Sequence, residues 1–263
     1  MQNTWQELLL HPGSADLVWE LFHENSKRGR YDEFPSDEEI AARLEQLHQS
    51  LPIVGAPIIQ LPPPLPLNTR LDSVISSRRS CYTTTDAALT LNHISTLIGY
   101  SSGITMKQGS PTTSRPLRAA PSAGALYPLE IFFHSVKGPE MRAGFYYYNP
   151  FNSELRLIKE GDARVAISEA MIQQDIPFKT SLIVFITAVF DRSVFKYGDR
   201  AYRFILLEAG HVVQNLNLVS EALGLGCLNV GGYFDREIDH ILGIDGLTHS
   251  TIYMVAIGKK PEA

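Results

Sequence analysis

Residues 181–190 read Ser-Leu-Ile-Val-Phe-Ile-Thr-Ala-Val-Phe, an almost wholly apolar run that is rich in β-branched side chains. Such a run fits a strand that is buried on both faces of a sheet. Residues 199–223 then carry apolar side chains at helical spacing for about seven turns, and Gly224 and Gly226 end that pattern. A doubly buried strand followed by a long helix predicts an α+β domain in which helices flank a central sheet.

Weaker signals on both sides of this pair predict the rest of a main domain over residues 71–263. Short apolar and aromatic runs favour strands over residues 129–136, 144–148 and 251–257. Residues 164–173 favour a helix. A further helix is expected to begin at Thr85 or Asp86, which both suit a helix cap, and to end near residue 98.

Residues 1–70 predict a separate helical arm. Residues 15–22 have apolar side chains at helix-like spacing, and Ser36 followed three residues later by Glu39 is a helix-start signal. Residues 61–67 read Leu-Pro-Pro-Pro-Leu-Pro-Leu, and prolines without backbone donors favour an extended segment. We interpret this segment as the connector between the arm and the main domain.

The composition argues against several classes of protein. The 263 residues are 44% hydrophobic, enough for a sizeable core, and their formal charge of −5 argues against general nucleic-acid binding. No apolar run reaches the length of about 18 residues that a membrane span needs. The first seven residues lack the basic start of a signal peptide, so a cytoplasmic protein is expected. Cys81 and Cys227 have no metal-ligand spacing, and no HExxH cluster occurs, so no metal site is predicted.

Two kinds of short motif could hold a ligand. Arg78-Arg79-Ser80 and the distant Lys259 could bind a phosphate by charge-assisted hydrogen bonds, although each could equally be a solvated basic turn. A flavin phosphate would require these charges to converge. The small residues of Pro121-Ser122-Ala123-Gly124 and of Gly231-Gly232 would let backbone amides approach a flat ligand, or form ordinary turns.

Lys196 and Tyr197 are the sharpest catalytic candidates. A cation beside a phenol favours phenolate, so either group could serve as a general base. A surface lysine beside a packed tyrosine is the alternative interpretation. His211 and Gln214 share one face of the long helix and could line a pocket, although satisfied interior polar groups are commoner.

Taken together, these residues resemble the nitroreductase superfamily and, more narrowly, its SagB-type thiazole- and oxazole-forming dehydrogenases. The matching stretches are residues 78–80, 121–130, 195–203, 207–215 and 231–235. The resemblance covers about residues 70–263, and residues 22–27 of the arm are also similar to family members. General nitroreductases lack the adjacent lysine and tyrosine, which is why the narrower family is preferred.

The resemblance implies an FMN-binding α+β fold with a mainly antiparallel central sheet, normally an intertwined homodimer with FMN at the dimer interface. It implies phosphate contacts from Arg78, Arg79, Ser80 and Lys259, a loop along the flavin at Pro121, Ser122, Ala123 and Gly124, a segment near the reactive flavin nitrogen at Gly231 and Gly232, and a catalytic pair at Lys196 and Tyr197. No metal is implied.

The implied reaction oxidises a peptide thiazoline or oxazoline to a thiazole or oxazole. A base removes the proton on the α-carbon, a hydride leaves the adjacent ring carbon for the flavin, and dioxygen reoxidises the flavin. The substrate would come from a partner cyclodehydratase or from a carrier protein of a nonribosomal assembly line. Two alternatives stay open: an NAD(P)H-dependent nitro or quinone reductase or cyclic-dipeptide oxidase, and a non-catalytic peptide-binding scaffold.

Overall fold

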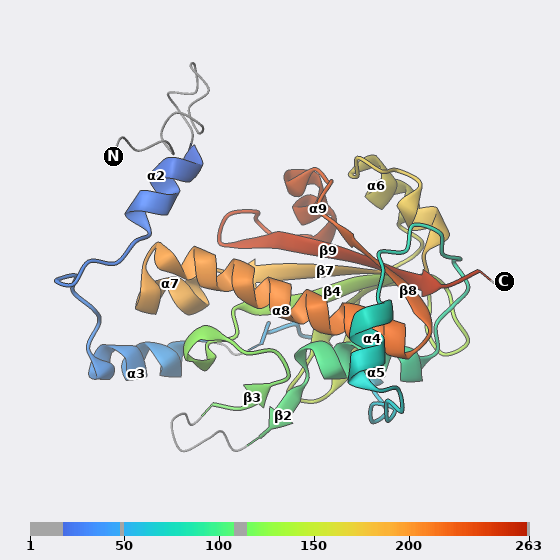
Figure 1. Ribbon diagram of the computed structural model, residues 1–263, viewed down its shortest axis with the longest axis horizontal. Helices are drawn as coiled ribbons and strands as arrows, with labels where there is room; N and C mark the ends of the chain where they lie inside the picture. Colours follow the sequence, from blue (N-terminus) through green and yellow to red (C-terminus); the bar gives the residue numbers. More distant parts are fainter. Residues whose placement is uncertain (1–17, 48–49, 108–114, 262–263) are drawn as a thin grey trace.

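A computed structural model describes residues 18–47, 50–107 and 115–261 of the chain (Figure 1). Its centre is a seven-stranded sheet of β1 (Ile58–Gln60), β4 (Leu129–Ser135), β5 (Gly144–Asn149), β6 (Glu154–Glu160), β7 (Leu182–Val189), β8 (Leu225–Val230) and β9 (His249–Lys259). The strand order is β1-β6-β5-β4-β7-β9-β8, and every neighbouring pair is antiparallel. The predicted α+β class with a mainly antiparallel central sheet is confirmed.

Strand β7 is the middle of the core, as its apolar run predicts. It pairs with β4 on one side and β9 on the other, and all its residues except Val189 are buried. Val184 and Ile186 pack into one hydrophobic cluster with residues of the long helix, whereas Ile183 and Phe185 pack into a second cluster. The two faces of the sheet therefore each have a core of their own.

The helices are α2 (Val18–Asn25), α3 (Asp37–Gln46), α4 (Leu71–Ser77), α5 (Leu91–Ser102), α6 (Arg164–Glu169), α7 (Asp191–Tyr197), α8 (Arg200–Ala222) and α9 (Asp235–Leu242). Two short 3-10 helices, η1 (Ala123–Ala125) and η2 (Ile176–Lys179), and a two-stranded ribbon of β2 (Ile104–Met106) and β3 (Leu117–Arg118) complete the fold. Helix α8 runs along the sheet from α7 at one end of the molecule to α4 at the other (Figure 1). Within the described residues, no helix is long and apolar enough to cross a bilayer.

Two predicted helix boundaries are wrong for the same physical reason. The helix expected from Thr85 or Asp86 begins at Leu91, because the Thr85 amide donates to the Lys259 carbonyl at 2.9 Å and Thr90 caps the helix instead. The helix expected over residues 164–173 ends at Glu169, and the Ile172 amide donates to the Gly232 carbonyl at 2.9 Å. In both places a pairing with a distant segment replaces the local helix.

Within its described residues, the arm contains two helices, α2 and α3. Helix α3 has the predicted capping box between Ser36 and Glu39. Helix α2 overlaps the predicted residues 15–22, of which residues 15–17 lie outside the described part. Residues 61–67 form neither helix nor strand. Strand β1, which precedes the predicted boundary at residue 70, pairs with β6 of the central sheet.

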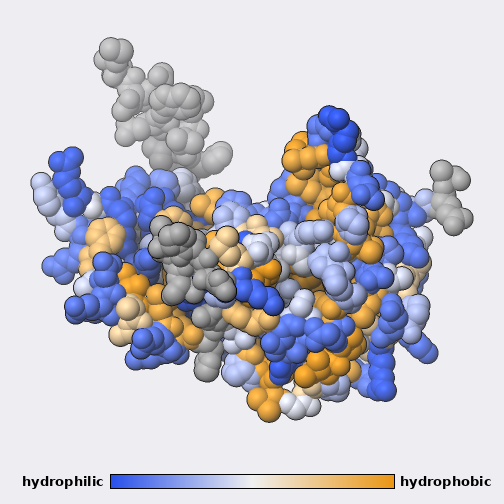
Figure 2. Space-filling model, turned by 90° about the horizontal axis from the view of Figure 1, so that it is seen from below, coloured by the Kyte–Doolittle hydropathy of each residue, from blue (hydrophilic) through white to orange (hydrophobic). Residues whose placement is uncertain are grey.

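The surface offers no simple guide to the site. The face seen from below mixes hydrophobic with hydrophilic residues (Figure 2). Along the outer side of α8, Tyr202, Leu206 and Leu207 are exposed.

Candidate active site

The small-residue loop and the Lys-Tyr pair meet, although more than 70 residues separate them in the sequence. Gly124 has a φ of +63°, and a Cβ atom placed there would lie 2.6 Å from the Tyr197 hydroxyl oxygen and 3.1 Å from Lys196 Nζ. The left-handed φ and the missing side chain both require glycine at this position. Two polar groups that can exchange protons thus lie directly over the Gly124 backbone.

A buried carboxylate holds the loop against α8. The Ser122 hydroxyl donates to Glu208 Oε2 at 2.5 Å and accepts from the Tyr127 amide at 2.9 Å. Pro121, Ser122, Ala123, Phe204, Leu207, Glu208 and His211 line a cleft between the loop and α8. Of the two residues that could line a pocket or be satisfied in the interior, His211 lines this cleft and Gln214 is not among its lining residues, and both side chains are exposed.

Glu208 was not predicted as a site residue. Its side chain is buried, and this burial raises its pKa to about 7 against the opposing effects of the Ser122 hydrogen bond and of the Arg118 and Arg192 charges. The sequence does hold a signal for it: a glutamate on the helix face of Ile205 and Val212 interrupts an apolar stripe. Near neutral pH this carboxyl can hold or release a proton.

The pKa of Tyr197 is shifted in the direction opposite to the one predicted from the sequence. Burial raises the pKa of the Tyr197 phenol, whereas the adjacent lysine was expected to favour phenolate. Lys196 Nζ lies 5.5 Å from the centroid of the Tyr197 ring. The ring of Phe204 packs edge-on against the Tyr197 ring, with 5.0 Å between the two centroids. Tyr197 therefore presents a protonated hydroxyl at neutral pH.

An ion pair behind the site fixes α7 to the sheet. Arg192 Nη1 lies 2.6 Å from Glu130 Oε1, and both side chains are almost fully buried. The Tyr147 hydroxyl donates to the second Glu130 oxygen at 2.9 Å, and Arg192 also donates to the Tyr127 carbonyl at 3.4 Å. The helix that carries Lys196 is thus tied to β4 and to the end of the small-residue loop.

The predicted phosphate residues gather at the other end of α8. Ser80 forms a parallel bridge with Cys227 of β8, and Thr85 pairs with Lys259 of β9, so both segments lie along one edge of the sheet. Arg78 lies close enough to Glu221 to help lower its pKa. Arg79 donates instead to the carbonyls of Ser76 and Arg78, at 2.8 Å each.

The structure does not bring the two groups of predicted residues together within one chain. Glu208 contacts the Ser122 loop, and Glu221 lies beside Arg78. The two glutamates are about 20 Å apart along α8, so the loop and the basic residues are separated by a similar distance. Gly231 and Gly232 follow β8, with open space over Gly231.

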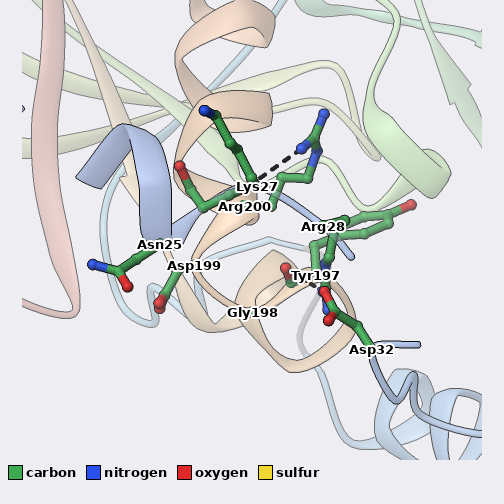
Figure 3. Close-up of a pocket in the computed structure, with 9 residues that line it drawn as sticks. Asn25, Lys27, Arg28, Asp32, Tyr197, Gly198, Asp199 and Arg200 are labelled. Carbon is green, nitrogen blue, oxygen red and sulfur yellow. Dashed lines mark hydrogen bonds between the residues drawn. The ribbon is translucent and has the colours of Figure 1, made fainter. Parts of the chain in front are cut away.

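A polar pocket adjoins Tyr197 on the side of the arm (Figure 3). It is lined by Asn25, Ser26, Lys27, Arg28, Asp32, Tyr197, Gly198, Asp199 and Arg200. The arm segment supplies one wall, and the turn between α7 and α8 supplies the other. Within the described residues, no three His, Cys, Asp or Glu side chains are grouped to hold a metal ion.

Comparison with known proteins gives consistent matches. The model of the nitroreductase family matches residues 75–259. Putative nitroreductase MJ1384 of Methanocaldococcus jannaschii is 31% identical over 193 residues, which cover 73% of this chain and 92% of that protein. The microcin B17-processing protein McbC of Escherichia coli is 26% identical over 155 residues, which cover 57% of each chain. The chain thus spans little more than half the length of McbC.

Solved structures show the same fold. A chain of the E. coli microcin synthetase McbBCD complex with truncated pro-MccB17 bound matches with a TM-score of 0.59 and 22% identity, over 93% of this chain and 92% of that one. A match at this identity shows the fold alone. The fold predicted from the resemblance is therefore confirmed.

Proposed function

The chain belongs to the nitroreductase family, and we propose that it is an FMN-dependent dehydrogenase that oxidises a peptide thiazoline or oxazoline to a thiazole or oxazole. The observation that carries this proposal is the position of Lys196 and Tyr197 over Gly124, where two proton-transfer groups converge on a loop of small residues. The similarity to a microcin-processing protein supports a peptide as the substrate. A partner cyclodehydratase, or an assembly-line carrier protein, would supply the ring.

The donor set of this chain fits FMN in two parts. Arg78, Ser80 and Lys259 offer cations and a hydroxyl at one sheet edge, which suits a phosphate. Ser122–Gly124 and Gly231–Gly232 offer backbone with little side-chain bulk, which suits a flat ring. When bound, FMN supplies the hydride acceptor, and dioxygen would reoxidise it.

The separation of these two parts supports a homodimer. About 20 Å of α8 lies between the loop and the basic edge, so one chain supplies only part of the contacts to one FMN. A second copy of the chain would bring its own loop to the basic edge of the first. The exposed apolar residues Leu206 and Leu207 on α8 suit such an interface.

The raised pKa of Tyr197 distinguishes the roles of the pair. A part-buried phenol that stays protonated donates a hydrogen bond, so Tyr197 would orient the azoline ring. Lys196, as the neutral amine, would then accept the α-carbon proton, because its Nζ lies over the same point of the loop. The ring loses that proton to the amine and a hydride to the cofactor, which accounts for the two hydrogens lost on aromatisation.

The test uses Lys196→Ala and Tyr197→Phe in the full-length protein. Both variants should keep their FMN, measured by absorbance and by mass of the released cofactor, and lose azoline oxidation by about 100-fold or more. Oxidation is followed as the loss of two hydrogens from a thiazoline peptide. Lys179→Ala and Tyr82→Phe, at exposed positions, are the matched controls. Full activity in both pair variants would refute the assignment.

A second candidate is an NAD(P)H-dependent nitro or quinone reductase, which the 31% identity to a putative nitroreductase favours. Rapid bleaching of the flavin by NAD(P)H, without azoline oxidation, would select this activity. A protein that neither contains nor binds FMN would instead select a peptide-binding scaffold.

A further inference from the structure

The N-terminal arm contacts the turn that carries the catalytic pair through three guanidinium groups. Arg28 Nη2 donates to the Tyr197 carbonyl at 2.7 Å (Figure 3). In the opposite direction, Arg200 Nη1 donates to the Ser26 carbonyl at 3.3 Å, and Arg203 Nε donates to the Ser26 hydroxyl at 2.8 Å. The arm therefore bonds to residues on both sides of the turn.

Packing reinforces these hydrogen bonds. The ring of Phe22 meets Tyr202 edge-on at 5.4 Å between centroids. Ser26 is only 2% exposed, although most residues around it in the arm are exposed. The Arg28 guanidinium lies 4.7 Å from the ring centroid of Phe34, which restricts its side chain. The arm segment of residues 22–28 is thus held at several points rather than by one surface contact.

The Tyr197 carbonyl is a sensitive place for such a contact. Tyr197 is the last residue of α7, and the carbonyls of a last helical turn lack intrahelical donors. Gly198 follows with a φ of 54°, and α8 begins at Arg200, so the chain reverses within two residues. A cation at this helix end satisfies the carbonyl and complements the helix dipole.

We propose that residues 22–28 are a positioning element for Lys196 and Tyr197, and that Arg28 is the positioning residue that fixes the turn between α7 and α8. The proposal deepens the proposed function and rests on it for its kinetic readout. It also gives a role to two sequence motifs that the proposed reaction does not use. These are residues 22–27 and the pair Arg200 and Arg203, which contact each other and need not touch the substrate.

The effect on catalysis follows from geometry. The Tyr197 hydroxyl and Lys196 Nζ occupy the space that a side chain at Gly124 would fill, so a small shift of the turn moves both groups away from the loop. A displacement near 1 Å can lower a rate by about 100-fold. Losing Arg28 should therefore lower kcat more than it alters KM.

The variants are Arg28→Ala, Arg28→Lys and the control Arg30→Ala, all in the full-length protein. Arg30 lies just beyond this segment in the arm, is exposed, and has no hydrogen-bond or ion-pair partner within the described part of the chain. We expect Arg28→Ala to lower kcat about 10- to 100-fold with FMN content and KM within about twofold. Arg28→Lys should recover part of this loss, and Arg30→Ala should match the wild type.

Two measurements separate positioning from mere structure. Amide hydrogen exchange of residues 194–201 should accelerate in Arg28→Ala and not in Arg30→Ala, because the Gly198 and Ala201 amides bond within this turn. In a background that carries both Lys196→Ala and Tyr197→Phe, Arg28→Ala should lower the residual kcat by less than about twofold, since neither side chain of the pair is left for Arg28 to position.

If amide exchange of residues 194–201 is unchanged in Arg28→Ala, the contact between Arg28 and the turn is refuted. If exchange is faster but kcat is unchanged, the positioning role is refuted. Equal losses of kcat in both backgrounds would also overturn it. If the wild type oxidises no azoline, the proposed function fails. The exchange comparison, together with the kcat of whichever flavin reaction the protein does catalyse, then still decides the role of Arg28.

Discussion

The two ends of α8 hold charged residues in opposite ways. At the end next to α7, Arg192 and Glu130 are almost fully buried and paired, and Glu208 is buried against Ser122. At the end next to α4, Lys259 is exposed and Arg78 is part-exposed. A buried charge needs its partner for the fold to be stable, whereas an exposed cation remains available to an anion. The first end is thus built for fixed geometry, and the second for binding.

Two glutamates on the same helix show this contrast directly. Burial raises the pKa of Glu208 to about 7. Glu221 is also partly buried, which would raise its pKa, but hydrogen bonds from Lys260 and Ser77 outweigh burial and lower it. The surroundings, rather than the residue type, determine which carboxyl can carry a proton at neutral pH.

The largest expected effect is on the buried ion pair. Arg192→Met should lower the free energy of unfolding by about 3–5 kcal/mol, because it leaves the Glu130 carboxylate buried without its cation. Arg79→Met, at the end of α8 next to α4, should change the free energy of unfolding by no more than about 0.5 kcal/mol. Urea unfolding followed by circular dichroism measures both values. Similar losses in the two variants would show that the ends do not differ in this way.

Glu208 should contribute a stability change that depends on pH. Between about pH 4.5 and 7 the unfolded chain has released this proton while the folded chain keeps it, so stability falls as the pH rises. The difference corresponds to about 3 kcal/mol. Glu208→Gln keeps an acceptor for Ser122 and should remove this fall.

The comparison is made by urea unfolding at pH 5 and pH 8. Glu221→Gln is the matched control on the same helix, and it should leave the change between pH 5 and pH 8 nearly as in the wild type, because a lowered pKa gives stability that is lost only on acidification below about pH 4.5. A Glu208→Gln variant that loses as much stability with rising pH as the wild type would show that Glu208 is ionised in the folded protein.

Local pattern was enough to predict the centre of the fold. The apolar run of β7 and the helical spacing of α8 agree with the observed elements to within one or two residues. Boundaries failed where a distant partner intervenes, as at Thr85, whose amide bonds to Lys259. Sequence spacing does not show which far-off carbonyl will reach an amide.

The candidate site was predictable in its parts but not in its assembly. The lysine, the tyrosine and the glycine loop were each visible as motifs, yet their contact over Gly124 depends on how α7 packs on the sheet. The direction of the Tyr197 pKa was wrong because the sequence shows the neighbouring lysine and hides the burial. Arg28 was missed for the same reason, since its acceptor is a backbone carbonyl at the end of α7.

The smallest expected effect on stability is that of a substitution at the end of α8 next to α4. Arg78→Ala should leave the free energy of unfolding within about 0.5 kcal/mol of the wild type, because the side chain is part-exposed. It should nevertheless lower FMN content several-fold, since a phosphate site that loses a guanidinium loses charge-assisted hydrogen bonds. Arg79→Ala is the matched control, because its guanidinium is already used on backbone carbonyls. An unchanged FMN content in Arg78→Ala would show that the FMN phosphate does not bind at this edge of the sheet. Equal losses in both variants would mean that net charge, rather than the position of one guanidinium, retains the cofactor.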